Sequence, residues 1–342
     1  MKRRYVGALM IIFLFLSGCQ MRLDVLNPAG DVAAGQRDLI VFSLAVMMIV
    51  VIVVAILFIW FLWKYRAGSP IERKGQMLKH SNRKLEIAWT VLPVLLLALM
   101  AVPMLIQTYN LETKADTETD AMQINVTGHR YWWQFDYPND NIRTAQELHL
   151  PANEEIIFHL ESSDVIHSFW IPQLGGKKDA IPGQTNQLYL KTGEPGIYEG
   201  KCAELCGASH AGMRFQVIVH EEEDFKKWKT AVKKEVTPKE GETVSHEGKR
   251  VFQQNCLTCH AADGTAVQHT KGPNLTLYGD REKISAILPN DEKHLKEWIQ
   301  NPEKFKPSID MPSHNNLSEQ ELNALVDYLH SLRQENVLEG RE

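Results

Sequence analysis

The stretch that decides the fold is KCAELCGASHAGM, residues 201–213. It holds Cys202 and Cys206, then His210 four residues later and Met213 three residues after that. Thiolate, imidazole and thioether groups form a soft ligand set, and such sets favour copper. A zinc knuckle is one alternative, but zinc prefers four closed nitrogen and sulfur ligands and rarely recruits methionine. A disulfide between the two cysteines is another, but it gives no role to the histidine and the methionine, so we expect copper.

An upstream histidine, His167, lies in the stretch DVIHSFW at residues 164–170. Two thiolates in so short a loop are able to bridge two metal ions instead of holding one. The pattern Cys-x-Glu-x-Cys-x-x-x-His-x-x-Met, with the upstream Asp-Val-x-His-Ser, resembles the binuclear CuA site of cytochrome c oxidase subunit II. The resemblance implies a cupredoxin-like fold and a set of copper ligands, namely His167, Cys202, Glu204, Cys206, His210 and Met213.

The carboxylate of Glu204 lies between the two cysteines in sequence. Two thiolates would repel it, so we expect the side chain to point away and the backbone carbonyl to be the weak copper ligand. The resemblance implies a second role, in which the Glu204 carboxylate reaches a magnesium ion at the contact with subunit I. Magnesium prefers oxygen ligands and is seldom held by the side chains of one chain alone, so this role depends on the partner.

Composition bounds the remaining possibilities. The chain has 342 residues, enough for two or three domains. Its net charge of −5 gives no bulk attraction to nucleic acid, so no nucleic-acid partner is expected. The five cysteines are distributed over three motifs, and no pair is left for a structural disulfide.

The N-terminus predicts a signal of the lipoprotein type over residues 1–18. A basic start, KRR at residues 2–4, precedes a short apolar run at residues 6–16. That run is shorter than the roughly 20 residues that cross a bilayer. The following LSGC, residues 16–19, resembles a bacterial lipobox, which implies cleavage before Cys19 and attachment of lipid to its sulfur. The alternative is a buried cysteine at the end of an anchor helix.

Residues 19–120 predict a membrane anchor with two transmembrane helices. The runs at about 39–63 and 87–106 carry no charge and are long enough to span a bilayer. The connection between them is rich in lysine and arginine, and acidic residues flank the pair on the other side. The positive-inside rule therefore places the connection in the cytoplasm. Both flanks of the helix pair, and everything after Asn110, are then expected on the outer face of the cell membrane.

Glu86 starts the second membrane helix, three residues before Trp89. A simple interpretation is an interfacial acid that favours a helix N-terminus. In the family that the chain resembles, a glutamate at this place lies at the mouth of a proton path into subunit I. Since ionisable groups near membrane depth are functional candidates, we keep Glu86 as a candidate entrance to that path.

Residues 121–220 predict an all-β sandwich or barrel, because short alternating runs are separated by glycine, proline and asparagine. Within it, the aromatic run at residues 131–135 resembles a Trp-Tyr-Trp stretch of subunit II, whose first tryptophan receives electrons. This chain has Tyr131 there, so we expect electrons to arrive by another route, and a role for Trp133 stays open. Residues 221–245 predict a charged helix and a linker.

Residues 246–342 predict a helical domain that resembles class I cytochrome c. Cys256, Cys259 and His260 form the Cys-x-x-Cys-His signal for covalent haem attachment, with the histidine as proximal ligand. A redox dithiol or half a zinc site are alternatives, but the chain has no second free cysteine pair for zinc. The sixth ligand of a haem is Met or His. Met311 is the only methionine after Met213, and the other contenders are His269, His294, His314 and His330.

The whole chain thus resembles subunit II of a bacterial haem–copper oxidase of the caa type, with a fused cytochrome c domain. The resemblance implies electron transfer from a small cytochrome c through haem c and CuA to subunit I, where oxygen is reduced and protons are pumped, with subunit III as a further partner. The same electron-transfer subunit serving a different terminal reductase, such as nitric oxide reductase, is one alternative. A membrane-bound copper carrier is another, but it needs neither two membrane helices nor a haem domain. Quinol oxidase subunits lack the copper cysteines.

Overall fold

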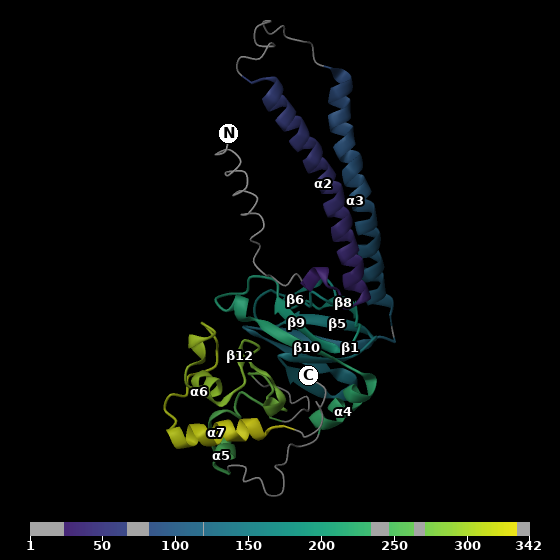
Figure 1. The fold of residues 1–342 in the computed structure, drawn as a ribbon. Coiled ribbons are helices and arrows are strands. Elements are labelled where there is room, and N and C mark those ends of the chain that lie inside the picture. Colours follow the sequence, from purple (N-terminus) through teal and green to yellow (C-terminus); the bar gives the residue numbers. More distant parts are fainter. Residues whose placement is uncertain (1–23, 67–81, 119, 234–245, 263–270, 334–342) are drawn as a thin grey trace.

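The computed structural model describes residues 24–66, 82–118, 120–233, 246–262 and 271–333. The predicted signal segment and Cys19 lie outside these residues. Figure 1 shows three parts: a long helical hairpin, a β-domain from which the hairpin projects, and a helical domain on the far side of the β-domain. The predicted multidomain architecture, with a hairpin of two long helices, an all-β domain and a helical domain, is confirmed.

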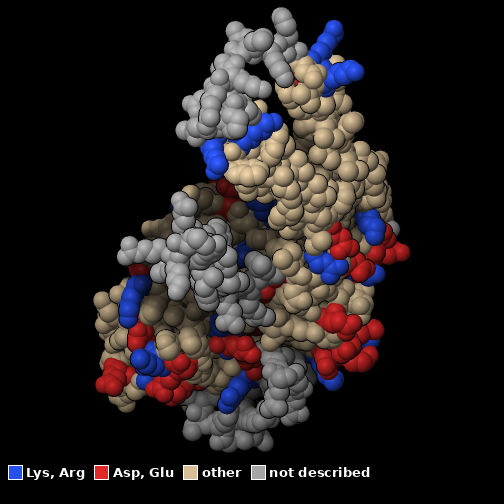
Figure 2. Space-filling model, turned by 45° about the horizontal axis from the view of Figure 1, so that its top comes forward, with Lys and Arg blue, Asp and Glu red and all other residues tan. Residues whose placement is uncertain are grey.

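The hairpin consists of α2 (Asp31–Lys64) and α3 (Arg83–Thr117). Both helices are long and apolar enough to cross a membrane by length and composition. A helix of 34 residues spans about 50 Å, more than the roughly 30 Å of a hydrocarbon core, so its ends extend beyond the lipid. Figure 2 shows uncharged residues along the hairpin and Lys and Arg at its end farthest from the β-domain, as the positive-inside prediction requires.

The other end of the hairpin packs against the β-domain. Val32 of α2 and Ala115 of α3 are buried and belong to the core of that domain. Gly175 faces the same contact, where a Cβ atom would lie 2.3 Å from Leu190 and 3.1 Å from Val32. The ammonium of Lys178 adds an ion pair with Glu112 at 3.1 Å. The membrane anchor therefore holds the β-domain by packing as well as by the chain connection.

The β-domain is a sandwich of two five-stranded sheets, in the orders β3-β2-β1-β5-β8 and β4-β10-β9-β6-β7. The parallel pairs β1–β5 and β4–β10 join segments that are distant in sequence. Apolar side chains of the two inner faces form one core that holds Trp133, Phe158, Phe169 and Phe215, which are fully buried. The strands are β1 (Met122–His129), β2 (Trp132–Tyr137), β3 (Ile142–Ala145), β4 (Glu147–Pro151), β5 (Glu155–Ser162), β6 (His167–Trp170), β7 (Lys177–Ala180), β8 (Asn186–Lys191), β9 (Gly196–Cys202) and β10 (Arg214–His220).

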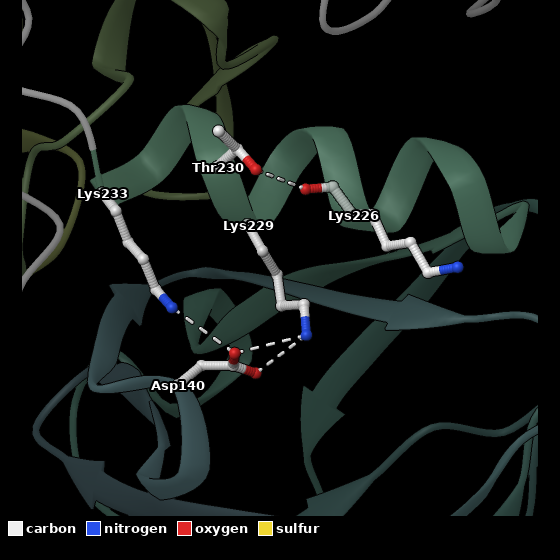
Figure 3. A pocket seen from close by; sticks show the side chains of 5 residues that line it. All are labelled: Asp140, Lys226, Lys229, Thr230 and Lys233. Atoms are coloured by element: carbon white, nitrogen blue, oxygen red, sulfur yellow. Dashed lines mark hydrogen bonds and ion pairs between the residues drawn. The ribbon is translucent and has the colours of Figure 1, made fainter.

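Helix α4 (Glu222–Lys233) covers one edge of the sandwich. Its Trp228 is 2% exposed and stacks on the imidazole of His149 at a centroid distance of 4.3 Å. Figure 3 shows Lys229 and Lys233 reaching across a shallow pocket to Asp140, at 3.2 and 3.4 Å. Since Asp140 binds both ammonium groups, this pocket belongs to the packing contact between α4 and the β-domain, and we assign it no ligand.

The helical domain has a core of its own, formed where α5 (His246–Asn255) crosses α7 (Glu319–Ser331) and α6 (Glu292–Gln300) packs alongside. Gly248 allows the close crossing, because a Cβ atom there would lie 2.0 Å from the carbonyl oxygen of Ala324. Ser318 and Glu321 cap α7 with reciprocal hydrogen bonds. A short hairpin, β11 (Lys283–Ile284) and β12 (Leu288–Pro289), completes this domain.

Candidate functional site

The cysteine loop joins β9 to β10 and brings four of the predicted ligands together. The sulfur atoms of Cys202 and Cys206 lie 3.9 Å apart. The Nδ1 atom of His210 is 3.7 Å from the Cys206 sulfur, and the Sδ atom of Met213 is also 3.7 Å from it. The backbone turns within η4 (His210–Gly212), which directs the imidazole back to the cysteine that precedes it.

His167 supplies a matching donor from the neighbouring strand β6. Its Nδ1 atom lies 3.9 Å from the Cys202 sulfur, and its imidazole is fully buried. Its Nε2 atom is 2.7 Å from the carboxylate of Asp164. Burial alone would raise the pKa of Asp164, but hydrogen bonds from His167, Val165 and Arg130 outweigh it and lower that pKa to about 2. The carboxylate therefore holds the imidazole with Nδ1 towards the sulfur, as outer carboxylates do at metal sites.

The Glu204 side chain is exposed, and its carbonyl oxygen is 3.3 Å from the Cys202 sulfur. Its carboxylate therefore points away from the thiols, while its carbonyl is directed at them. Hydrogen bonding between the two thiols lowers the pKa of Cys202 and raises that of Cys206. One thiolate thus forms readily, and a cation is needed to hold two.

This donor set fits a pair of copper ions. His167 and both cysteines offer ligand atoms within 4.8 Å of one another. Each sulfur has one imidazole nitrogen and one weaker donor beside it, the Glu204 carbonyl at Cys202 and the Met213 thioether at Cys206. Two cysteine sulfurs, two imidazoles and a thioether form a soft donor set, and such a set suits copper. All six predicted copper ligands thus lie in one place, although the assignment of each as a ligand stays a prediction.

The haem motif follows α5 directly. Cys256, Cys259 and His260 form a turn closed by the bonds from the Cys259 and His260 amides to the Cys256 carbonyl. The Nδ1 atom of His260 lies 2.8 Å from the carbonyl oxygen of Pro273, which fixes the ring and leaves Nε2 as the iron donor. Burial lowers the pKa of His260, so the imidazole is held in the neutral form that binds a metal. These residues fit a covalently attached haem.

Met311 lies beyond α6 and packs against the core of the helical domain. Among the competing histidines, His294 bonds to Asp291 at 2.7 Å and His330 lies 3.4 Å from Asn290. His314 shares the Met311 loop, and His269 lies outside the described residues. Met311 as the sixth ligand stays a prediction.

Glu86 lies in the first turn of α3 and is half-buried. This turn is at the end of the hairpin away from the β-domain, where Lys and Arg gather (Figures 1 and 2). The proton-path role of Glu86 and the magnesium role of Glu204 both depend on a second subunit, and they stay predictions.

The structure adds two residues, Asp164 and Lys306, for which no role was predicted. Asp164 precedes His167 by three residues, and this spacing is the signal that could have identified it. Lys306 carries no such signal, yet it is fully buried at the contact between the β-domain and the helical domain. Burial lowers its pKa to about 7, while the nearby sulfur of Cys206 acts in the opposite direction. A buried titratable residue placed so close to the cysteine loop is a functional candidate.

Comparison with protein families divides the chain in the same order. A model described as the transmembrane domain of cytochrome c oxidase subunit II matches residues 19–106. The model for the periplasmic domain of that subunit matches residues 141–221, and a cytochrome c model matches residues 245–333.

Curated relatives extend over nearly the whole chain. Cytochrome c oxidase subunit 2 of Alkalihalophilus pseudofirmus is 41% identical over 331 residues, covering 95% of this chain and 96% of the relative. The subunit of the same name from Bacillus sp. (strain PS3) is 40% identical, covering 94% and 95%. A quinol oxidase subunit 2 from Bacillus cereus is 36% identical but covers 69% of this chain and 81% of its own length.

Proposed function

The chain belongs to the cytochrome c oxidase subunit II family, in the form with a fused cytochrome c domain. We propose that it is the electron-transfer subunit of its complex. In this role it takes electrons from a cytochrome c and delivers them to subunit I on the outer face of the membrane. The observation that carries the proposal is the presence of the paired thiols and the Cys-x-x-Cys-His motif in one chain, on adjacent domains.

The residues of the helical domain divide the work of holding haem c. Cys256 and Cys259 would attach the haem through their sulfurs, and His260 and Met311 would supply the ligands of its iron. Methionine ligation would raise the potential of the haem. When bound, haem c accepts and releases one electron at a time, and the tether keeps it at high effective concentration beside the copper domain.

In the β-domain, Cys202, Cys206, His167 and His210 would hold the two copper ions through their sulfur and imidazole donors. The Glu204 carbonyl and Met213 would complete the set as weaker donors. The exposed Glu204 carboxylate is free of the thiols and available to magnesium at the contact with subunit I. Because one short loop and one strand of the sandwich hold these residues, the site would change little on gaining an electron, which fast transfer requires.

The membrane part sets where this happens. The hairpin fixes the β-domain at the outer surface and docks on subunit I, with subunit III completing the complex. Glu86, at the cytoplasmic end of α3, takes part in proton uptake by subunit I, where oxygen is reduced and protons are pumped. Cys19 carries the lipid of a bacterial lipoprotein and strengthens an anchor that the two helices already provide.

The experiment is to purify the complex and measure oxygen uptake with reduced cytochrome c, together with its copper and haem content. We expect two copper ions and one haem c for each copy of this chain, and oxygen uptake that depends on both. No oxygen uptake, with activity on nitric oxide, would show that this subunit delivers electrons to a different terminal reductase. Copper that leaves readily, without a mixed-valence electron resonance signal, would indicate a copper carrier.

A further inference from the structure

The helical domain contacts the β-domain at the loop that carries the copper ligands. The ammonium of Lys306 donates a hydrogen bond of 2.9 Å to the backbone carbonyl of Tyr131. Its aliphatic stem lies beside Gly212, where a Cβ atom would be 3.6 Å from the Lys306 Cε atom. Gly212 stands between His210 and Met213. The lysine side chain therefore crosses from one domain to the other, with its stem beside the metal loop and its ammonium on Tyr131.

A second hydrogen bond lies next to the first. The hydroxyl of Ser209, which is 5% exposed, donates to the carbonyl oxygen of Pro307 at 2.7 Å. Ser209 immediately precedes His210, and Pro307 is four residues before Met311. A buried hydroxyl and a buried ammonium at one contact are costly unless both are bonded, so this contact is a specific one.

Tyr131 braces the metal loop from beneath. It is 3% exposed, and its phenolic oxygen accepts a hydrogen bond of 3.1 Å from the Ala208 amide. Lys306 thus holds the backbone of the residue whose ring holds the loop. Tyr131 stands where the family pattern has a tryptophan, and in this chain its carbonyl is bonded to the helical domain.

We propose that Lys306 and the Ser209–Pro307 hydrogen bond form the docking contact through which an electron passes from haem c to the copper pair. The inference rests on the proposed function and adds the positioning residues of its internal step. That step moves one electron, oxidising ferrous haem and reducing the copper pair, and no covalent bond forms or breaks. The Ser209–Pro307 bond joins the loop of His210 to the segment that leads to Met311, and Lys306 of the same segment bonds to Tyr131, which in turn bonds to the His210 loop at Ala208. The contact is therefore a bonded connection between the segments that carry the two sets of ligands.

The test uses the whole purified complex, in which the haem domain is reduced by a light pulse and electron arrival at copper is followed. Lys306→Met keeps the apolar stem and removes the ammonium. We expect it to slow the transfer about tenfold or more, as a loss of positioning does. Ser209→Ala is the milder second variant and slows the transfer less. Lys304→Met, two residues away and exposed, is the matched control and leaves the rate unchanged.

Two further measurements separate positioning from damage. Copper content, haem content and the electron resonance signal are expected to stay at parent levels in all three variants. Hydrogen exchange of the peptide covering residues 207–213 is expected to rise in the Lys306 and Ser209 variants but not in the control, because these variants open the contact. The slowed transfer is also expected to depend on solvent viscosity, since the domains must then find each other by diffusion.

The outcomes distinguish this inference from the proposed function. If both the Lys306 and Ser209 variants transfer electrons within about twofold of the parent rate, with both centres loaded, the docking contact is overturned and the proposed function stands. If the unmodified complex shows no transfer from haem to copper, the proposed electron-transfer function itself is overturned. A Lys306 variant that loses copper would reject positioning and assign the lysine to the metal loop.

Discussion

The carboxylate of Asp164 sets the orientation of one copper ligand. It lies 2.7 Å from His167 and also accepts hydrogen bonds from the Arg130 and Val165 amides. Asp164→Asn keeps the volume but removes the charge, so the ring is held less firmly. We expect copper affinity to fall about 10- to 100-fold, the range for outer partners of metal ligands.

Copper retention against a chelator is the measurement for this variant, with Asp224→Asn on the exposed face of α4 as control. The control keeps parent affinity because Asp224 pairs with Lys227 far from the loop. Unchanged copper affinity in Asp164→Asn would show that burial alone orients His167.

Met311 is the second residue whose predicted role, as sixth ligand of the haem iron, a single substitution can test. Met311→Ala leaves both attachment cysteines in place, so haem stays bound to the protein. Loss of the thioether is expected to shift the absorption of the haem and to lower its potential, since Met ligation raises it. Absorption spectra during a redox titration test this. If neither spectrum nor potential changes, His314 on the same loop becomes the candidate.

Helix α4 is the element that closes the end of the β-sandwich, and Trp228 is its main buried group. The indole stacks on His149 and packs against Phe225, with ring centroids 5.4 Å apart. Trp228→Ala is expected to destabilise the β-domain by about 3–5 kcal/mol, the usual cost of removing a large buried aromatic side chain.

Thermal unfolding of the copper domain measures this cost. Lys226→Ala is the control, because Lys226 lies on the same helix, is exposed and pairs only with its own helix in the described contacts. A Trp228 variant that unfolds at the same temperature as the control would mean that α4 covers the sheet without stabilising it.

At the scale of the whole molecule, local motifs were predictable and contacts between domains were not. The spacing of Cys202, Cys206, His210 and Met213 reflects a single loop, so the sequence alone brought them together. Each membrane helix was likewise predictable, because its uncharged run is one continuous stretch of sequence. Helices α2 and α3 extend past the predicted spans because their outer ends pack on the β-domain. Lys306 meets Tyr131 across 175 residues, and no periodicity reports a contact of that kind.

The two redox domains have separate hydrophobic cores apart from Leu277 of the helical domain, which packs into the core of the β-domain, and we expect from this that they load independently. Cys206→Ser removes one bridging sulfur from the copper loop but touches nothing in the core around Phe252 and Trp298. We therefore expect the mixed-valence electron resonance signal to disappear while haem c stays attached with its parent spectrum. Oxygen uptake should fall with the signal, because electrons then stop at the haem. Loss of haem in the same variant would show that the contact between the domains is required for folding as well as for transfer.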